Sequence, residues 1–371
     1  MDIGILGGGI AGLSVALALH RTGHRPRVYE RGAAPATMGA GVTLWPNAGF
    51  VLDALGLLPD VAAAGGRPRA MRRYDNAGHA LGSLDISALD RLMGYPTHTI
   101  LRRDLLAVLL AHAARAGIPV EYGHRAVAIE PDADGRMDSV ARRFVVGDNT
   151  PVYQGFVNWI GIASGPGLAE DMAIQDYWGV GERFGCVAVR PDLVYWAGAE
   201  ARSLAAAVQG PDPRAEVADR FAGWADPIAR LIQATPADAV RLIAVHDLDT
   251  PAAWHRANVL LVGDAAHAPL PTSGQGACQA LEDAWHLARC LAGAPRDLDA
   301  ALSAFTALRQ PKTAALTEQA RVYARGLFER DPQACRLRDQ QIKAVDAGAA
   351  LRAMASAWGQ GLACGGGGER G

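Results

Sequence analysis

The first thirty residues alternate between apolar runs and one helical repeat. Residues 3–6 form a short apolar run, which predicts a buried strand. Apolar positions from Leu13 to His20 then recur at helical spacing, and the pattern stops near Gly23. Residues 26–29 predict a second strand, which ends at Glu30. The chain therefore begins with a predicted strand, helix and strand.

A glycine-rich turn, Gly7-Gly8-Gly9-Ile10-Ala11-Gly12, joins the first strand to the helix. The first glycine allows the tight turn, the second lets the backbone approach a pyrophosphate, and Gly12 lets helix and strand pack closely. The helix N-terminus supplies N–H donors to phosphates, and Glu30 is expected to accept hydrogen bonds from an adenosine ribose. The negative charge of Glu30 argues against a 2′-phosphate. Together with Ala11 and Arg31, these residues predict a site for FAD or NAD.

A second glycine-containing segment lies far downstream. Residues 259–262 predict a buried strand, followed at once by Gly263-Asp264, and Gly274-Gln275-Gly276-Ala277 opens a predicted helix that runs to Gly293. Asp264 is suited to hold a ribityl hydroxyl. The turn from Gly274 to Ala277 is suited to offer backbone N–H groups to a flavin pyrimidine edge. This pairing favours FAD over NAD.

In these motifs the sequence resembles the class A flavoprotein monooxygenases, the para-hydroxybenzoate-hydroxylase-like family. Gly263-Asp264 and the segment from Pro271 to Gly276 match two family motifs. Arg102 matches the family's flavin-contacting arginine, and residues 39–47, which include Thr43, resemble its isoalloxazine-side loop. The resemblance covers almost the whole chain. It implies FAD as cofactor, NAD(P)H as electron donor, and an α/β fold whose Rossmann-like FAD-binding domain has a parallel sheet.

The middle of the chain has a different pattern, with short apolar and aromatic runs separated by turn residues between about residues 153 and 245. These runs predict an antiparallel sheet that forms the floor of a pocket. Two helices are expected, near 214–222 and 227–233. We expect the FAD-binding domain to comprise 1–71, 96–150 and 256–371, and the substrate-binding sheet domain to comprise 72–95 and 151–255.

Four segments resemble bacterial FAD-dependent urate hydroxylases more narrowly: residues 155–161, 221–224, 246–247 and 263–264. Those enzymes carry an arginine and, twelve residues later, a tyrosine that face the substrate, and Arg183 and Tyr195 keep that interval. A guanidinium binds an anionic oxo-purine in a bidentate manner, and a tyrosine hydroxyl orients it. The alternative is that both residues belong to a sheet motif common to many monooxygenases. Thr272 stands where those hydroxylases have an aspartate, so urate is a leading example of the substrate.

The resemblance implies that NAD(P)H reduces the flavin and that O2 then forms a C4a-hydroperoxyflavin, which hydroxylates an aromatic or heteroaromatic small molecule. The protein positions the ring and keeps water away, since water promotes loss of hydrogen peroxide. His267 follows the glycine-aspartate pair and is expected to be a scaffold residue. Two rivals remain: an FAD-binding pseudoenzyme, and an FAD oxidase or dehydrogenase that makes no oxygenated product.

The family's D-G motif is abnormal in this chain. Family members have a meander and a returning apolar strand before A-D-G-x-x-S-x-x-R. Here Ser139 lies five residues after Asp134 and Arg142 lies eight, each one more than the family spacing, and no apolar run precedes Asp134. The missing strand predicts exposed apolar surface, weak flavin retention and uncoupled NAD(P)H oxidation, unless a segment such as 143–146 takes the vacant position in the sheet.

Composition and charge limit the kinds of partner and the cellular compartment that we expect for this chain. The 371-residue chain has a net charge of −2, which gives no basic field for nucleic acid or anionic lipid. The arginines from Arg67 to Arg73 are expected to form a solvated loop. Five scattered cysteines without C-x-x-C spacing argue against a disulfide framework or metal site. No signal peptide or membrane span is evident. We expect a cytoplasmic monomer or homodimer.

Overall fold

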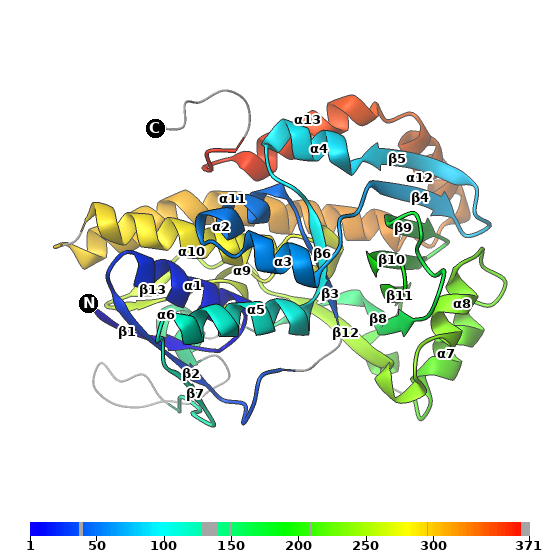
Figure 1. Ribbon diagram of the computed structural model, residues 1–371. Helices are drawn as coiled ribbons and strands as arrows, with labels where there is room; N and C mark the ends of the chain where they lie inside the picture. Colours follow the sequence, from blue (N-terminus) through cyan, green and yellow to red (C-terminus); the bar gives the residue numbers. More distant parts are fainter. Residues whose placement is uncertain (37–39, 128–139, 148–149, 208–209, 295, 365–371) are drawn as a thin grey trace.

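The N-terminal layer is a small parallel sheet covered by helices (Figure 1). The computed structural model describes residues 1–36, 40–127, 140–147, 150–207, 210–294 and 296–364. Strands β1 (Asp2–Leu6), β2 (Arg25–Glu30) and β7 (Val120–Tyr122) pair in parallel in the order β1-β2-β7. Helix α1 (Ile10–Arg21) follows the glycine-rich turn. The expected strand, helix and strand are confirmed.

The strand before Gly263 does not join this sheet within the described residues. β14 (Val259–Leu260) pairs with β13 (His255–Arg256), and its two residues are only half-buried. Residues 143–146 were considered for the vacant position in the sheet, but they lie in helix α6 (Val140–Val146). The buried guanidinium of Arg142 in α6 donates to the Ala265 and Asp249 carbonyls. Asp134 and Ser139 lie outside the described residues.

A two-stranded ribbon lies between the parallel sheet and the larger sheet. β3 (Gly41–Leu44) pairs antiparallel with β6 (His98–Leu101), and α5 (Arg102–Arg115) starts directly after β6. Three short helices accompany the ribbon: α2 (Pro46–Ala54), α3 (Leu58–Ala64) and α4 (Ile86–Met93). The apolar faces of α1, α2, α4 and α5 contribute to one large hydrophobic core. The ribbon is therefore anchored on the cofactor side of the molecule.

The second sheet has seven strands in the order β12-β8-β11-β10-β9-β4-β5. The run from β12 through β11 and β10 to β9 is antiparallel, as expected, whereas β4 pairs with β9 in parallel. Its strands are β4 (Ala70–Asp75), β5 (Ala80–Asp85), β8 (Val152–Ser164), β9 (Ala173–Trp178), β10 (Glu182–Arg190), β11 (Leu193–Ala201) and β12 (Arg241–Asp247). The predicted helices are confirmed as α7 (Pro213–Arg220) and α8 (Ile228–Gln233). Their apolar side chains form a core on one face of the sheet with Phe184 and Trp196.

Long helices complete the C-terminal third. α10 (Gly276–Gly293) packs beside α11 (Leu298–Leu327), a 30-residue helix that runs from the cofactor side to the large sheet (Figure 1). The remaining elements are α9 (Asp264–His267), η1 (Leu204–Ala206), η2 (Ala237–Ala239), η3 (Pro271–Ser273), α12 (Pro332–Lys343) and α13 (Ala347–Gly359). Because α11 contacts both halves of the molecule, it fixes the cofactor side relative to the large sheet. No helix in the described ranges is long and apolar enough to cross a membrane.

Candidate active site

The glycine-rich turn has the close contacts that its sequence predicts. A Cβ added at Gly12 would lie 2.0 Å from the Gly7 carbonyl oxygen, so only glycine fits there. A Cβ added at Gly9 would meet no atom of the described residues within 4 Å, and in that part of the chain α1 has neither a side-chain cap nor an acidic residue in its first turn. The helix end therefore presents free N–H donors to an open space, which suits a pyrophosphate. The Glu30 carboxylate is held by the Gly8 and Gly32 N–H groups, each at 2.7 Å, and Arg31 beside it is exposed.

The two glycine motifs meet in space although about 250 residues separate them. Gly263 has a φ of +57°, and a Cβ there would lie 2.6 Å from the Ala11 side chain. Asp264 is exposed at the start of α9, and its carboxylate has no hydrogen-bond partner among the described residues. This open carboxylate beside the N-terminus of α1 has the right chemistry for a sugar-alcohol hydroxyl. The residues present therefore fit FAD.

The turn before α10 differs in part from expectation. The Gly274 N–H donates to the Pro271 carbonyl at 3.1 Å, and the Gln275 N–H donates to the Ser273 hydroxyl at 3.2 Å. The Gln275 side chain is buried within the protein. Gly276 and Ala277 lie in the first turn of α10, which has no side-chain cap. In this conformation, therefore, the donors available to a flavin edge come from Gly276 and Ala277, while Gly274 and Gln275 shape the turn.

A fully buried polar network supports both motifs from behind. The Asp283 carboxylate accepts the Gly263 N–H and lies within hydrogen-bond distance of His267, both at 2.7 Å. Arg309 on α11 donates to Asp283 at 2.8 Å and to Glu282 at 2.6 Å. Burial raises the pKa of Asp283, but His267 and Arg309 outweigh it and hold this pKa far below its usual range. His267 is buried against Trp254 and belongs to this scaffold, as expected from the sequence.

The ribbon connects the cofactor side to the large sheet. Thr43 in β3 pairs with Thr99, and the Arg102 N–H donates to the Ala40 carbonyl at 2.8 Å while its side chain stays exposed. A Cβ added at Gly41 would lie 2.6 Å from Tyr195, so the ribbon backbone rests directly on the tyrosine side chain. Tyr195 thus lies where the predicted flavin-side loop meets the predicted substrate sheet.

Three rows of side chains project from the face of the sheet that turns toward β3 and α11, because alternate residues of a strand share a face. The row nearest β3 is apolar apart from Tyr195, the second has small residues at its centre, and the third contains Arg183. The rows are given in the strand order β4, β9, β10, β11 and β8. The first row is Met71, Ile174, Val187, Tyr195 and Ile162, and the second row is Arg73, Asp176, Gly185, Ala197 and Ile160. The third row, given from β9 onward, is Trp178, Arg183, Ala199 and Asn158.

Arg183 lies flat across the centre of these rows. A Cβ added at Gly185 would lie 2.6 Å from its guanidinium, so the glycine makes room for the side chain. Its Nε donates to Asp176 at 2.6 Å. Burial lowers the pKa of Arg183, but the adjacent Asp176 more than compensates and the pKa is raised. Burial also raises the pKa of Tyr195 to about 12, against the effect of Arg183, so its hydroxyl stays protonated at neutral pH.

Three residues on or against this face were not found from the sequence. Asp176 is the ion-pair partner of Arg183, and the Tyr323 hydroxyl on α11 approaches Asp176 at 3.4 Å. Arg73 was placed in a solvated loop, which is wrong: Arg72 and Arg73 lie in strand β4, and the Nε of Arg73 is buried. The alternation of Met71, Arg72 and Arg73 in a strand was the available signal, because it places Arg73 on the same face as Met71.

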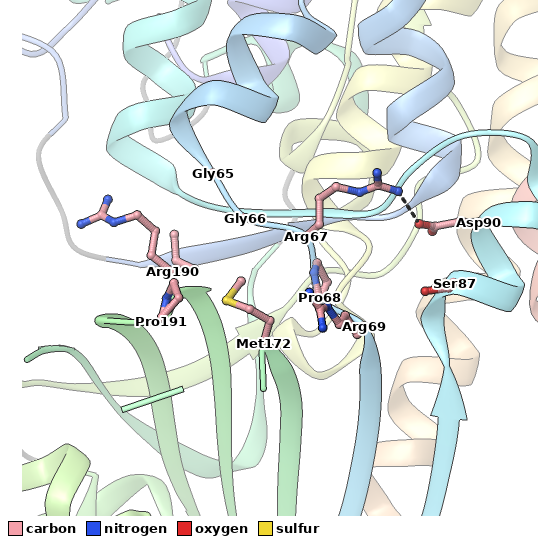
Figure 2. A pocket seen from close by; sticks show the side chains of 11 residues that line it. Gly65, Gly66, Arg67, Pro68, Arg69, Ser87, Asp90, Met172, Arg190 and Pro191 are labelled. Atoms are coloured by element: carbon pink, nitrogen blue, oxygen red, sulfur yellow. Dashed lines mark hydrogen bonds and ion pairs between the residues drawn. The ribbon is translucent and has the colours of Figure 1, made fainter. Parts of the chain in front are cut away.

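A separate hollow of about 530 Å³ lies at the end of this sheet, beside the start of β4 (Figure 2). Arg67, Arg69 and Arg190 line it, but they do not converge. Arg67 turns toward Asp90, at 3.4 Å, whereas Arg190 points in the opposite direction. Nothing in this hollow resembles a built anion site. Within the described ranges, no group of three or more histidine, cysteine, aspartate or glutamate side chains is arranged to hold a metal ion.

Comparison with known proteins agrees with this geometry. Residues 1–145 and 236–320 match the family model described as "FAD binding domain". The chain is 34% identical to aurachin C monooxygenase/isomerase of Stigmatella aurantiaca, over 82% of this chain and 84% of that protein. It is 32% identical to 3-amino-4-hydroxybenzoate 2-monooxygenase of Streptomyces cremeus, over 92% of each.

A solved structure gives the same result for the fold. The crystal structure of Klebsiella pneumoniae HpxO complexed with FAD and uric acid superposes with a TM-score of 0.86 at 27% identity, covering 96% of each chain. The likeness therefore extends over both sheets and the C-terminal helices. On the matched family model, the level of identity and the cradle formed by the two glycine motifs, the chain belongs to the FAD-binding-domain family and is an FAD-dependent monooxygenase.

Proposed function

We propose that this monooxygenase uses NAD(P)H and O2 to hydroxylate an aromatic or heteroaromatic small molecule, with a urate-like oxo-purine as the leading example. One observation carries the proposal: the guanidinium of Arg183 lies over Gly185 on the same face as Tyr195, which lies directly beneath the ribbon. A planar donor and a phenol hydroxyl on one face are suited to a flat, oxygen-rich ring.

The bound FAD supplies the oxygen chemistry, and the protein supplies binding, orientation and a dry environment. The nitrogens of Arg183 that do not contact Asp176 donate hydrogen bonds to ring oxygens. The protonated Tyr195 hydroxyl fixes the orientation of the ring. Ile174, Val187 and Ile162 flank it with apolar surface, which limits the access of water. Gly9, Asp264, Gly276 and Ala277 hold the cofactor.

The proposed division of the chain follows from these roles. Residues 1–71, 96–150 and 256–371 form the cofactor part, and residues 72–95 and 151–255 form the substrate sheet. The enzyme acts as a monomer or homodimer, and the scattered cysteines suit a reducing cytoplasm.

Two relatives support this class of substrate. One is named for a reaction on 3-amino-4-hydroxybenzoate, and one was crystallised with uric acid. Both molecules are planar, oxygen-rich rings. Thr272, whose hydroxyl is buried without a hydrogen-bond partner among the described residues, stands where the urate hydroxylases have an aspartate, so the proposal includes both kinds of ring.

The test is a panel of aromatic substrates incubated with the FAD-loaded enzyme and NADH or NADPH. Oxidation of the nicotinamide is followed by absorbance, and hydroxylated product is identified by mass spectrometry. Substrate-stimulated oxidation with a matching yield of product supports the proposal. Oxidation that yields only hydrogen peroxide supports the uncoupled oxidase that the abnormal D-G motif suggested, and binding of FAD without oxidation supports a pseudoenzyme.

A further inference from the structure

Two guanidinium groups and one carboxylate face the proposed substrate region from neighbouring strands. Arg73 and Asp176 are register partners on β4 and β9, and Asp176 forms its ion pair with Arg183. The negative charge of Asp176 is therefore balanced by the positive charge of Arg183. Arg73 has no carboxylate partner among the residues that the structure describes, so Arg73, Asp176 and Arg183 together carry a net charge of about +1.

The surroundings of Arg73 are polar but do not neutralise it. Among the described residues its Nε is buried without a hydrogen-bond partner, and its Nη2 lies 3.7 Å from the Met71 sulfur. The guanidinium lies 5.8 Å from the Trp178 ring centroid, near the outer limit for a cation–π interaction. Tyr323 stays neutral, because burial and Asp176 raise its pKa to about 12 against the effects of Arg73 and Arg183.

A charge of this kind is costly unless something pairs with it. Arg73 is half-buried with its Nε enclosed, and a guanidinium without a carboxylate partner is suited to a carboxylate ligand, which accepts two parallel hydrogen bonds. The Met71 contact places Nη2 toward the apolar row nearest β3, on the same face as Arg183 and Tyr195. The guanidinium of Arg73 thus lies beside the proposed substrate region, with Tyr323 as a neutral hydrogen-bond partner.

Building on the proposed function, we infer that Arg73 is a second cationic anchor, which selects substrates with one anionic group on the ring. The Arg183–Asp176 pair is neutral as a whole and recognises ring oxygens through hydrogen bonds. Arg73 supplies the net charge. The favoured class is a monoanionic aromatic or heteroaromatic acid, rather than a neutral ring of the same shape.

The experiment measures binding to the FAD-loaded enzyme without turnover. 3-Amino-4-hydroxybenzoate and its carboxamide are titrated while the change in flavin absorbance is recorded. We expect wild-type enzyme to bind the carboxylate at least tenfold more tightly than the carboxamide. Arg73→Gln is expected to lose most of this preference with little change for the carboxamide, and Arg73→Lys to regain part of it. Hydroxylation is assayed separately, so binding selectivity without product would refute the proposed function and leave this inference standing.

The matched control is Arg72→Gln. Arg72 is the preceding residue of the same strand, but it lies on the opposite face and pairs with Asp171. Its replacement should leave both dissociation constants unchanged. Three results would overturn the inference: a wild-type enzyme that does not prefer the carboxylate, including one that binds neither probe; an Arg73→Gln variant that weakens both probes equally, as a structural role predicts; or one that weakens neither.

Discussion

Replacing Arg309 by methionine tests the buried network behind the flavin motifs. The guanidinium of Arg309 is 1% exposed and donates to Asp283, to Glu282 and to Gln279, and both carboxylates are fully buried. Removing one partner of a buried ion pair costs about 3–5 kcal/mol, because the remaining charge is left uncompensated. Glu282 keeps Lys312 at 2.8 Å, and Asp283 keeps His267 and the Gly263 N–H. We therefore expect the free energy of unfolding to fall by the lower limit of this range, about 3 kcal/mol.

This loss converts to a shift in melting temperature. At about 2.1 cal/mol/K per residue, a chain of 371 residues has an unfolding entropy of about 0.8 kcal/mol/K, so the midpoint should fall by about 4 °C. The assay is thermal unfolding of the FAD-loaded protein, followed by tryptophan fluorescence and by release of flavin fluorescence. Flavin release should come earlier than in the wild type, because Asp283 holds the Gly263 backbone.

The charge argument also predicts a rescue. Adding Asp283→Asn to Arg309→Met removes the carboxylate that has lost its arginine partner, whereas Glu282 keeps Lys312, so the double variant should regain at least 1 °C despite carrying a second substitution. Arg325→Met is the control, since Arg325 lies on the same helix but pairs with Glu318 at the surface; its midpoint should stay within 1 °C. A single variant that melts with the wild type, or a double variant that melts below the single one, would refute the reasoning.

The remaining predictions concern the cofactor, the substrate and pH. Gly12→Ala should purify without flavin, since its Cβ would lie 2.0 Å from a carbonyl oxygen; a normal flavin content by absorbance would contradict this. Asp264→Ala should weaken FAD by about 1–3 kcal/mol in a fluorescence titration, because a ribityl hydroxyl loses its partner, and unchanged affinity would remove Asp264 from the site. Arg183→Lys should raise KM at least tenfold, because a point charge does not replace a planar donor, and unchanged KM and coupling would return Arg183 to a purely structural role. Burial lowers the pKa of His98 and of His286 to about 4, so stability is full above about pH 6.5, where the unfolded side chains are neutral, and falls as pH drops toward 4. At pH 5 each histidine costs about 2 kcal/mol, and His286→Gln should flatten the measured dependence.

The local elements and the cofactor motifs were accessible from the sequence because their signals are short-range. The turn from Gly7 to Gly12 combines adjacent steric requirements, and the strands and helices of the middle region follow apolar periodicity over a few residues. The family resemblance added the position of Arg183 and Tyr195, whose roles as substrate contacts stay predictions.

Contacts between distant elements were not accessible in the same way. The Asn47 side chain donates a hydrogen bond to Glu282, which lies 235 positions away, and no local sequence pattern predicts such a pair. Arg73 was misplaced because a cluster of arginines suggests solvent, whereas its strand alternation carried the relevant information. The abnormal D-G motif was recognised, but the proposed replacement strand was wrong, since residues 143–146 are helical.

Helix α11, which has Pro311 in its interior, links the two chemical regions through one continuous helical register. Arg309, in its first half, holds the network behind the flavin motifs, and Tyr323, fourteen residues later, reaches Asp176 on the large sheet. At 1.5 Å per residue the two side chains are about 21 Å apart along the axis. Inserting or deleting one residue between them would rotate one end relative to the other by about 100°. The helix therefore restricts how this chain can diverge: substitutions can remodel the substrate face, but a change of length between these two positions would uncouple its geometry from that of the cofactor.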